Sequence, residues 1–250
     1  MSGFKNHFSD ASGDYAAFRP SYPDALFAWL AAAAPACDTA WDCATGSGQA
    51  ALGLATRFSH VLASDASAAQ IAHASPHPRV VYRAAPAEAS GLADASVDLV
   101  TVAQAAHWFD LPRFYAEARR VLKPGGVLAL WGYGHLELPG DLAAPYQRFH
   151  TETVGPWWPP ERALVENRYR DLDFPFEEIA APAFAIEAEW TLPRLLAYLA
   201  TWSAVKRCRA ATGGDPLPAL AKELARQWRE PDTAKPLVWP LFMRVARMPA

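Results

Sequence analysis

Two carboxylates and a glycine turn lie close together in the sequence and could bind one small ligand. Asp42 comes just before a turn that carries Gly46 and Gly48, and Asp65 follows the next apolar run. Glycine reaches backbone conformations closed to other residues and lets a ligand approach the main chain. Carboxylates accept hydrogen bonds and pair with cations. The combination predicts a site for a nucleotide-like cofactor.

The glycine turn alone is compatible with two kinds of cofactor. Residues 46–51 fit the G-x-G-x-x-G/A pattern of dinucleotide folds, in which a diphosphate rests on a helix N-terminus. A phosphate gains nothing from a carboxylate before the turn, whereas an ammonium group pairs with it. Asp42 therefore favours a methionine nucleoside over a nicotinamide dinucleotide. The alternatives are an NAD(P)-dependent oxidoreductase and a regulator that binds the cofactor without catalysis.

A second group of candidate residues follows the apolar run 97–103. Gln104 and His107 come directly after it. Because imidazole titrates near neutral pH, His107 is a candidate general base; a packing or substrate-binding role is the alternative. A carboxylate acceptor would need no base but would need a cation to hold it, and Arg19 is the candidate for positioning it.

The elements that position these residues alternate between strand and helix. Apolar patterns predict strands at 39–43, 60–64, 80–83, 97–103 and 127–131, with helices at 22–34, 49–58, 67–73 and 111–122. Two more strands are expected at 184–190 and 237–247. The predicted fold class is α/β, a Rossmann-like seven-stranded mostly parallel sheet sandwiched by helices. In such sheets the ligand crevice lies at the carboxyl ends of the strands.

The segment after residue 133 has a different pattern. Prolines and tryptophans crowd into 155–160, between helical stretches at 142–153 and 161–170. An insertion of this length is typical of a cap over a crevice. Helices at 192–206 and 217–229 follow, separated by a loop at 211–216. We expect a single domain over 1–250, with a core at about 36–133, 184–190 and 237–247, and a cap at about 1–22 and 134–182.

Composition narrows the range of partners. The 250 residues carry a net charge of -3, which gives no basic surface for nucleic acid. The three cysteines, Cys37, Cys43 and Cys208, form no C-x-x-C pair, which favours a reducing compartment and indicates no metal site. No apolar run is long enough to cross a membrane. We therefore predict a cytoplasmic protein that acts on a small molecule, and the oligomeric state stays open.

Several motifs together resemble a known enzyme family. They are DCATGSG at 42–48, the acid at 65, PAE at 86–88, DASVDLV at 94–100 and RVLKPGG at 120–126. This set resembles the class I S-adenosylmethionine-dependent methyltransferases. RPSYP at 19–23 and QAAHWF at 104–109 resemble the trans-aconitate methyltransferase-like branch of that family.

The resemblance implies roles for individual residues. Asp42 and the backbone at 44, 46 and 48 would hold the methionine end of S-adenosylmethionine, and Asp65 would accept from the ribose hydroxyls. The adenine side would be lined by Ala66, Ala87 and Glu88, and Gln104 would lie beneath the sulfonium. The implied reaction is methyl transfer to a small-molecule acceptor, with a carboxylate or hydroxyl oxygen as the expected atom and S-adenosylhomocysteine as the product.

The sequence departs from the family pattern at two positions. Ala44 stands where the family most often has its first glycine, and a negative φ would accommodate alanine there. Pro86 stands where many members carry an aspartate for the adenine amine. The second departure leaves adenine without that side-chain partner.

Overall fold

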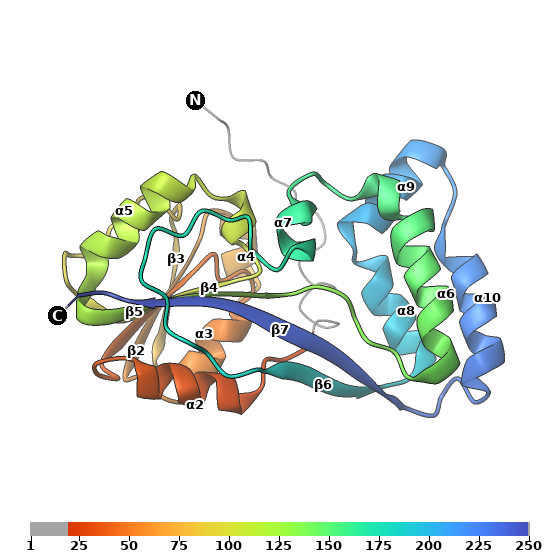
Figure 1. The fold of residues 1–250 in the computed structure, drawn as a ribbon, viewed down its shortest axis with the longest axis horizontal. Helices are drawn as coiled ribbons and strands as arrows, with labels where there is room; N and C mark the ends of the chain where they lie inside the picture. The colour runs from red at the N-terminus through yellow and green to blue at the C-terminus, as the bar shows by residue number, and fades with distance from the viewer. Residues whose placement is uncertain (1–19, 250) are drawn as a thin grey trace.

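The fold is a twisted sheet covered by helices on both faces, with a helical lobe at one end (Figure 1). The structure is a computed structural model that describes residues 20–249. Within those residues seven strands form one sheet in the order β3-β2-β1-β4-β5-β7-β6. The strands are β1 (Thr39–Cys43), β2 (His60–Asp65), β3 (Val80–Ala84), β4 (Val97–Ala103), β5 (Leu122–Tyr133), β6 (Ala185–Trp190) and β7 (Lys235–Arg247).

The strand directions match the predicted fold class. Strands β1 to β5 pair in parallel, and β7 is antiparallel to both of its neighbours, β5 and β6. The described helices are α2 (Asp24–Ala33), α3 (Gln49–Leu54), α4 (Ala68–Ala72), α5 (Leu111–Val121), α6 (Ala143–Arg148), α7 (Arg162–Glu166), α8 (Leu192–Ala200), α9 (Ser203–Thr212) and α10 (Leu217–Trp228). The Rossmann-like seven-stranded sheet is confirmed.

Alternation along the strands divides the core of the sheet into two faces. Ala40 of β1 packs on the face covered by α2 and α3, whereas Trp41 packs on the face covered by α5. Successive side chains of a strand point to opposite faces. Leu99 and Val100 of β4 divide in the same way. Because both faces are buried, these strands have continuous apolar sequences, and this is why their predicted bounds agree with the structure.

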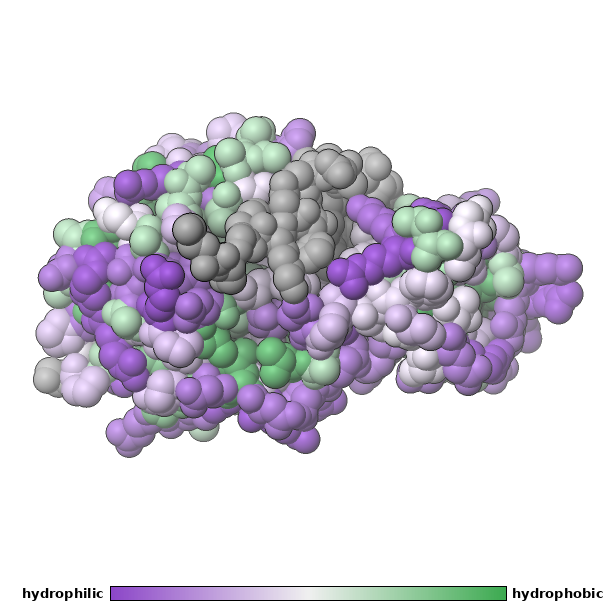
Figure 2. Space-filling model, turned by 90° about the horizontal axis from the view of Figure 1, so that it is seen from above, coloured by the Kyte–Doolittle hydropathy of each residue, from purple (hydrophilic) through white to green (hydrophobic). Residues whose placement is uncertain are grey.

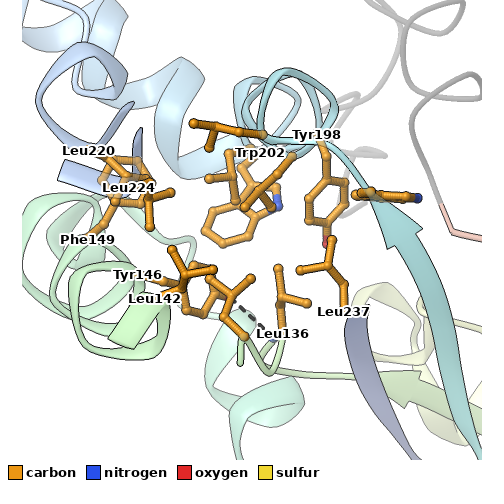
Figure 3. Packing of buried hydrophobic residues seen from close by; sticks show 14 of the residues in the cluster. Leu136, Leu142, Tyr146, Phe149, Tyr198, Trp202, Leu220, Leu224 and Leu237 are labelled. Atoms are coloured by element: carbon orange, nitrogen blue, oxygen red, sulfur yellow. Dashed lines mark hydrogen bonds between the residues drawn. The ribbon is translucent and has the colours of Figure 1, made fainter. Parts of the chain in front are cut away.

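The second lobe has its own hydrophobic cluster, in which side chains from α6, α8 and α10 meet those of β6 and β7. Figure 3 shows Tyr146 and Phe149 on one side facing Tyr198 and Trp202 on the other. The Tyr146 hydroxyl accepts a hydrogen bond from the Leu136 backbone N–H at 3.2 Å, which fixes the chain where it leaves β5. The lobe therefore contains 192–228 as well as the first part of the segment 134–182 expected as a cap, whereas Tyr169, Leu172 and Phe174 of that segment pack against the sheet on the face of α5.

The prediction of one helix over 192–206 is wrong. Helix α8 ends at Ala200, and Trp202 has extended backbone before α9 begins. The indole of Trp202 packs edge-on against Tyr146 and Tyr198, so it is needed inside the cluster rather than in a continuous helix. Helix α9 then includes the first two residues of the predicted loop and ends at Thr212, and Gly213, whose φ is 70°, caps it.

A buried carboxylate interrupts the apolar run of β4. Asp98 is 0% exposed and accepts hydrogen bonds from the backbone N–H groups of Asp38 and Thr39 at 3.1 and 2.9 Å. The Lys123 ammonium lies 2.7 Å from its other oxygen. Asp98 therefore joins the entrance of β1 to the start of β5, and Lys123 serves a structural ion pair rather than a nucleic-acid surface.

The surface is mixed in polarity. Figure 2 shows hydrophilic residues predominating at the outer end of the second lobe and smaller hydrophobic groups over the sheet-bearing lobe. Within 20–249, every helix is too short or too polar to cross a bilayer.

Candidate active site

A cavity of about 780 Å³ lies at the carboxyl ends of the parallel strands. Its wall is formed by the turn after β1, the loops after β2 and β3, and the segment after β4. Tyr22, Tyr133 and Glu161 complete it from the side of the second lobe. Its volume is within the range of small-molecule sites, and its position is that expected for a ligand crevice in an open α/β sheet.

The two glycines of the turn serve different purposes. Both have left-handed backbone, with φ 58° at Gly46 and 89° at Gly48. A Cβ on Gly48 would lie 2.3 Å from the hydroxyl of Tyr82 on β3, so this glycine is required for packing. A Cβ on Gly46 would meet no atom of the described chain within 4 Å, and Gly46 lines the cavity. The backbone at Gly46 is therefore open to a ligand.

Ala44 has left-handed backbone. Its φ is 56°, so the condition under which alanine would be accommodated at this position, a negative φ, is not met. An L-residue with a Cβ is strained there by contact with its own carbonyl. The strain is sustained by the turn, in which the Thr45 N–H donates to the Ser64 carbonyl at 2.9 Å. Ala44 lines the cavity, so the backbone here has the course expected of a glycine.

Asp42 is buried behind the turn and does not line the cavity. It is 0% exposed, and its two oxygens accept from the hydroxyls of Thr45 at 2.5 Å and Thr101 at 2.8 Å. Burial raises the pKa of Asp42 to about 6, against the lowering effect of these hydroxyls. Thr45 does line the cavity, so the structure places Thr45, and not Asp42, on the cavity wall.

Asp65 lies on the cavity wall and is held in place by two backbone donors. One oxygen accepts from the Gly46 N–H at 2.9 Å and the other from the Ser67 N–H at 2.8 Å. Burial raises the pKa of the Asp65 carboxyl, and these N–H groups oppose the rise. The cap of α4 is Ser67, whose hydroxyl accepts from the Gln70 N–H. Each oxygen of Asp65 keeps a free lone pair for a ligand hydroxyl.

Gln104 ends β4 in a fixed orientation. Its φ is 57°, its N–H donates to the Trp131 carbonyl at 2.9 Å, and its side-chain amide donates to the Tyr133 carbonyl at 2.8 Å. A Cβ on the adjacent Gly132 would lie 2.8 Å from the Gln104 side-chain oxygen. The glycine therefore makes room for this amide, which lines the cavity.

The residues expected on the adenine side come together on one wall. They are Ala66, Ala87 and Glu88, and Pro86, the departure from the family pattern, also lines the cavity. One oxygen of Glu88 accepts from the Asp110 N–H at 3.0 Å, which ties this wall to the start of α5. The structure thus brings Asp65, Gln104 and the adenine-side residues around one cavity.

His107 is paired with Tyr169, which sequence reasoning missed. The Nδ1 atom of His107 lies 2.9 Å from the Tyr169 hydroxyl oxygen. With the Tyr169 hydroxyl as the donor to Nδ1, the ring carries its own hydrogen on Nε2. Burial, with the nearby Arg162 charge, lowers the pKa of His107 to about 3. A neutral ring of this kind donates a hydrogen bond and is a poor base near pH 7.

Tyr169 is held by an unusual backbone. Arg168 and Tyr169 both have left-handed φ, 56° and 58°. The Arg244 guanidinium donates to the Tyr169 carbonyl at 2.9 Å and to the Leu172 carbonyl at 3.0 Å. The only sequence signal for this tyrosine was its place in the segment after 160.

Arg19, the residue predicted to position a carboxylate acceptor, lies outside the described residues.

Comparisons with known proteins agree with this geometry. Residues 41–130 match the methyltransferase domain family. A protein of Dictyostelium discoideum, assigned as a methyltransferase, is 32% identical over 251 residues, which cover 98% of this chain and 95% of that protein. The chain belongs to the class I S-adenosylmethionine-dependent methyltransferases.

A solved structure of this enzyme family is also similar along the chain. It comes from Anaeromyxobacter dehalogenans and is assigned as a type II methyltransferase; it is 48% identical, with a TM-score of 0.89, over 93% of this chain and 100% of that one. A methyltransferase of Mycobacterium tuberculosis is 39% identical over 124 residues, 49% of this chain and 50% of that protein. This methyltransferase is therefore an enzyme rather than an idle regulator, and the oxidoreductase alternative is not supported.

Proposed function

We propose that this methyltransferase transfers the methyl group of S-adenosylmethionine to an oxygen of a small molecule, and that the acceptor is a carboxylate. The supporting observation is the neutral His107 held by Tyr169 at 2.9 Å. With its pKa lowered to about 3, His107 has little capacity to take a proton from a hydroxyl or a phenol. A carboxylate is already ionised near pH 7 and needs no base.

The residues at the cavity fit the cofactor. Asp65 offers a free lone pair on each oxygen for the two ribose hydroxyls, and Gly46 exposes backbone where a Cβ would meet nothing within 4 Å of the described chain. Asp42 stabilises the turn under the methionine end through Thr45. The alanines at 66 and 87, with Glu88, would contact the adenine, and Gln104 would lie near the sulfonium.

In this proposal the cofactor supplies an electrophilic methyl group, and the chain supplies alignment. An in-line displacement needs the acceptor oxygen behind the methyl carbon, in a site that excludes water. The Nε2 hydrogen of His107 would bind one acceptor oxygen. Arg113 on the cavity wall, and Arg162, whose charge acts on His107, are cations that can attract an anionic acceptor. The resemblance of 104–109 to the trans-aconitate branch supports the same acceptor class.

Incubation with methyl-labelled cofactor tests this proposal. Small carboxylic acids, phenols and amines would be offered separately, and the products identified by mass spectrometry and by alkaline hydrolysis of the methyl ester. We expect label in esters of the acids. Label confined to N-methyl or phenol-ether products would overturn the carboxylate assignment, and the absence of binding of S-adenosylhomocysteine in calorimetry would overturn the cofactor site.

A further inference from the structure

Two histidines and a glutamate converge beside the cavity although they are far apart in the sequence. His135 follows the end of β5, His150 lies in the π-helical turn Phe149–Thr153, and Glu166 ends α7. The His135 Nε2 atom is 2.5 Å from one Glu166 oxygen, and the His150 Nε2 atom is 3.7 Å from the other. One donor atom from each of the three side chains lies within 4.8 Å of the other two.

The buried histidine has no hydrogen-bond partner to explain its position. His150 is 4% exposed, and within residues 20–249 neither of its ring nitrogens has a hydrogen-bond partner. Buried polar groups are usually hydrogen-bonded, and an unsatisfied one often marks a missing ion or water. The rings of His135 and His150 contact each other edge to face, with their centroids 4.3 Å apart, so the two imidazoles are close enough to share one ligand.

We propose that His135, His150 and Glu166 form a binding site for a divalent ion of the zinc type. Two imidazoles and one carboxylate are a ligand set that zinc and other first-row metals take, with a fourth position left for water or another ligand. Ligand atoms around tetrahedral zinc lie about 3.3 Å apart, given bonds of about 2.0 to 2.1 Å. The donor atoms here lie within 4.8 Å of one another, so the widest pair would have to close by up to about 1.5 Å to reach that spacing.

Arg162 is a positively charged side chain that contacts the proposed ligand Glu166, and it would lie close to a bound cation. Its Nε donates to one Glu166 oxygen at 2.6 Å, and its guanidinium lies over the Trp158 ring at 4.8 Å. An outer partner of this kind commonly fixes a metal-binding carboxylate through its second oxygen. Here that second oxygen is also the one that lies 3.7 Å from the His150 Nε2 atom. The other oxygen, now against His135, is the one available to a metal.

The proposed ion would link three segments at the border of the two lobes. It would join the exit of β5, the π-helical turn and α7, which lies between the lobes in Figure 1. Tyr133 and Glu161, on the same segments as two of the ligands, line the cavity. The three proposed ligands do not line the cavity themselves, so the site is separate from the cofactor residues.

Cobalt titration tests this site without reference to activity. Tag-free protein treated with a chelator and dialysed would be titrated with Co²⁺, which absorbs visibly in four-coordinate nitrogen and oxygen sites. We expect one equivalent to bind, Zn²⁺ to displace it, and the thermal midpoint to rise with Zn²⁺. Glu166→Gln and His135→Asn should weaken binding by at least about tenfold. The control His73→Asn changes an exposed histidine and should bind as the parent does.

Two results would overturn the proposal. The first is a parent protein that shows no visible band and no thermal shift with either ion. The second is equal binding by the parent and by folded Glu166→Gln and His135→Asn. Because His150→Gln alters a buried side chain, it would be interpreted only after circular dichroism shows native structure. Failure here would leave the methyl-transfer proposal untouched, because no cofactor residue is changed.

Discussion

Replacing Asp65 by alanine is the most direct test of the cofactor site. Each Asp65 oxygen accepts one backbone N–H, from Gly46 at 2.9 Å and from Ser67 at 2.8 Å. The substitution removes these two bonds and, in the complex, the two bonds to the ribose hydroxyls. It should therefore lower both stability and cofactor affinity, and the two effects can be measured separately.

The loss of affinity can be worked out from the lone pairs. A carboxylate offers about four acceptor positions, of which the two N–H groups use one on each oxygen. The remaining positions allow one ribose hydroxyl on each oxygen. A hydrogen bond to a charged acceptor contributes about 1.5 kcal/mol at the lower end, so two contribute about 3 kcal/mol. That corresponds to a dissociation constant about 100-fold higher, since about 1.4 kcal/mol is tenfold.

Calorimetry with S-adenosylhomocysteine measures this loss. Urea unfolding of the same samples reports the stability cost and shows that the variant is folded. Asp215→Ala is the matched control, because Asp215 also accepts a backbone N–H at a helix start, from Leu217 at 3.1 Å, but lies in the second lobe. A folded Asp65→Ala protein that binds within about twofold of the parent would refute the assignment of Asp65 to the ribose.

Four further predictions follow from individual side chains. Ala44→Gly removes a backbone strain of about 1 to 2 kcal/mol from the folded protein. The glycine also raises the conformational entropy of the unfolded chain, which costs about 0.4 to 1 kcal/mol of stability, so the net effect should be a higher thermal midpoint. A lower midpoint would mean that the left-handed φ of Ala44 is not strained. Tyr169→Phe should lower kcat by about tenfold with unchanged cofactor affinity, and an unaltered kcat would remove its positioning role. The pKa of His107 is lowered to about 3 in the folded protein, so as pH falls below 6.5 the unfolded chain binds a proton that the folded protein does not. The parent should therefore lose stability relative to His107→Gln by up to about 1.4 kcal/mol per pH unit between pH 6.5 and about 4. Urea midpoints of the two proteins that change in parallel with pH would contradict this. Asp98→Ala should cost about 3 kcal/mol in urea unfolding, because it leaves Lys123 and two backbone N–H groups without their partner, and a cost near zero would show that the pair is dispensable.

The sheet could be predicted from the sequence because its strands are buried on both faces. The run 97–103 has an apolar pattern throughout except at Asp98, and the predicted bounds of this strand and of 39–43 are those of β4 and β1. Short loops between strand and helix leave few topologies open. The apolar pattern of a segment was sufficient to predict its strand wherever that strand is buried on both faces.

Other features depend on contacts between distant segments and could not be predicted in this way. The backbone break at Trp202 exists because the indole fits between Tyr146 and Tyr198. The pairing of His107 with Tyr169 joins residues 62 apart in the chain. The left-handed φ of Ala44 cannot be read from the alanine itself, which favours other backbone regions; the family's glycine at this position was the only signal.

The length of β5 and β7 restricts how an acceptor can enter. These strands stay paired from Val127↔Arg247 to Tyr133↔Leu241, and β7 continues into the second lobe, where it pairs with β6. A hinged swing of that whole lobe would have to bend β7 between Pro240, which pairs with β6, and Leu241, which pairs with β5. We expect the acceptor to enter through smaller displacements, in α7 and its flanking turns, and the rate of product release to respond to substitutions there rather than in the long strands.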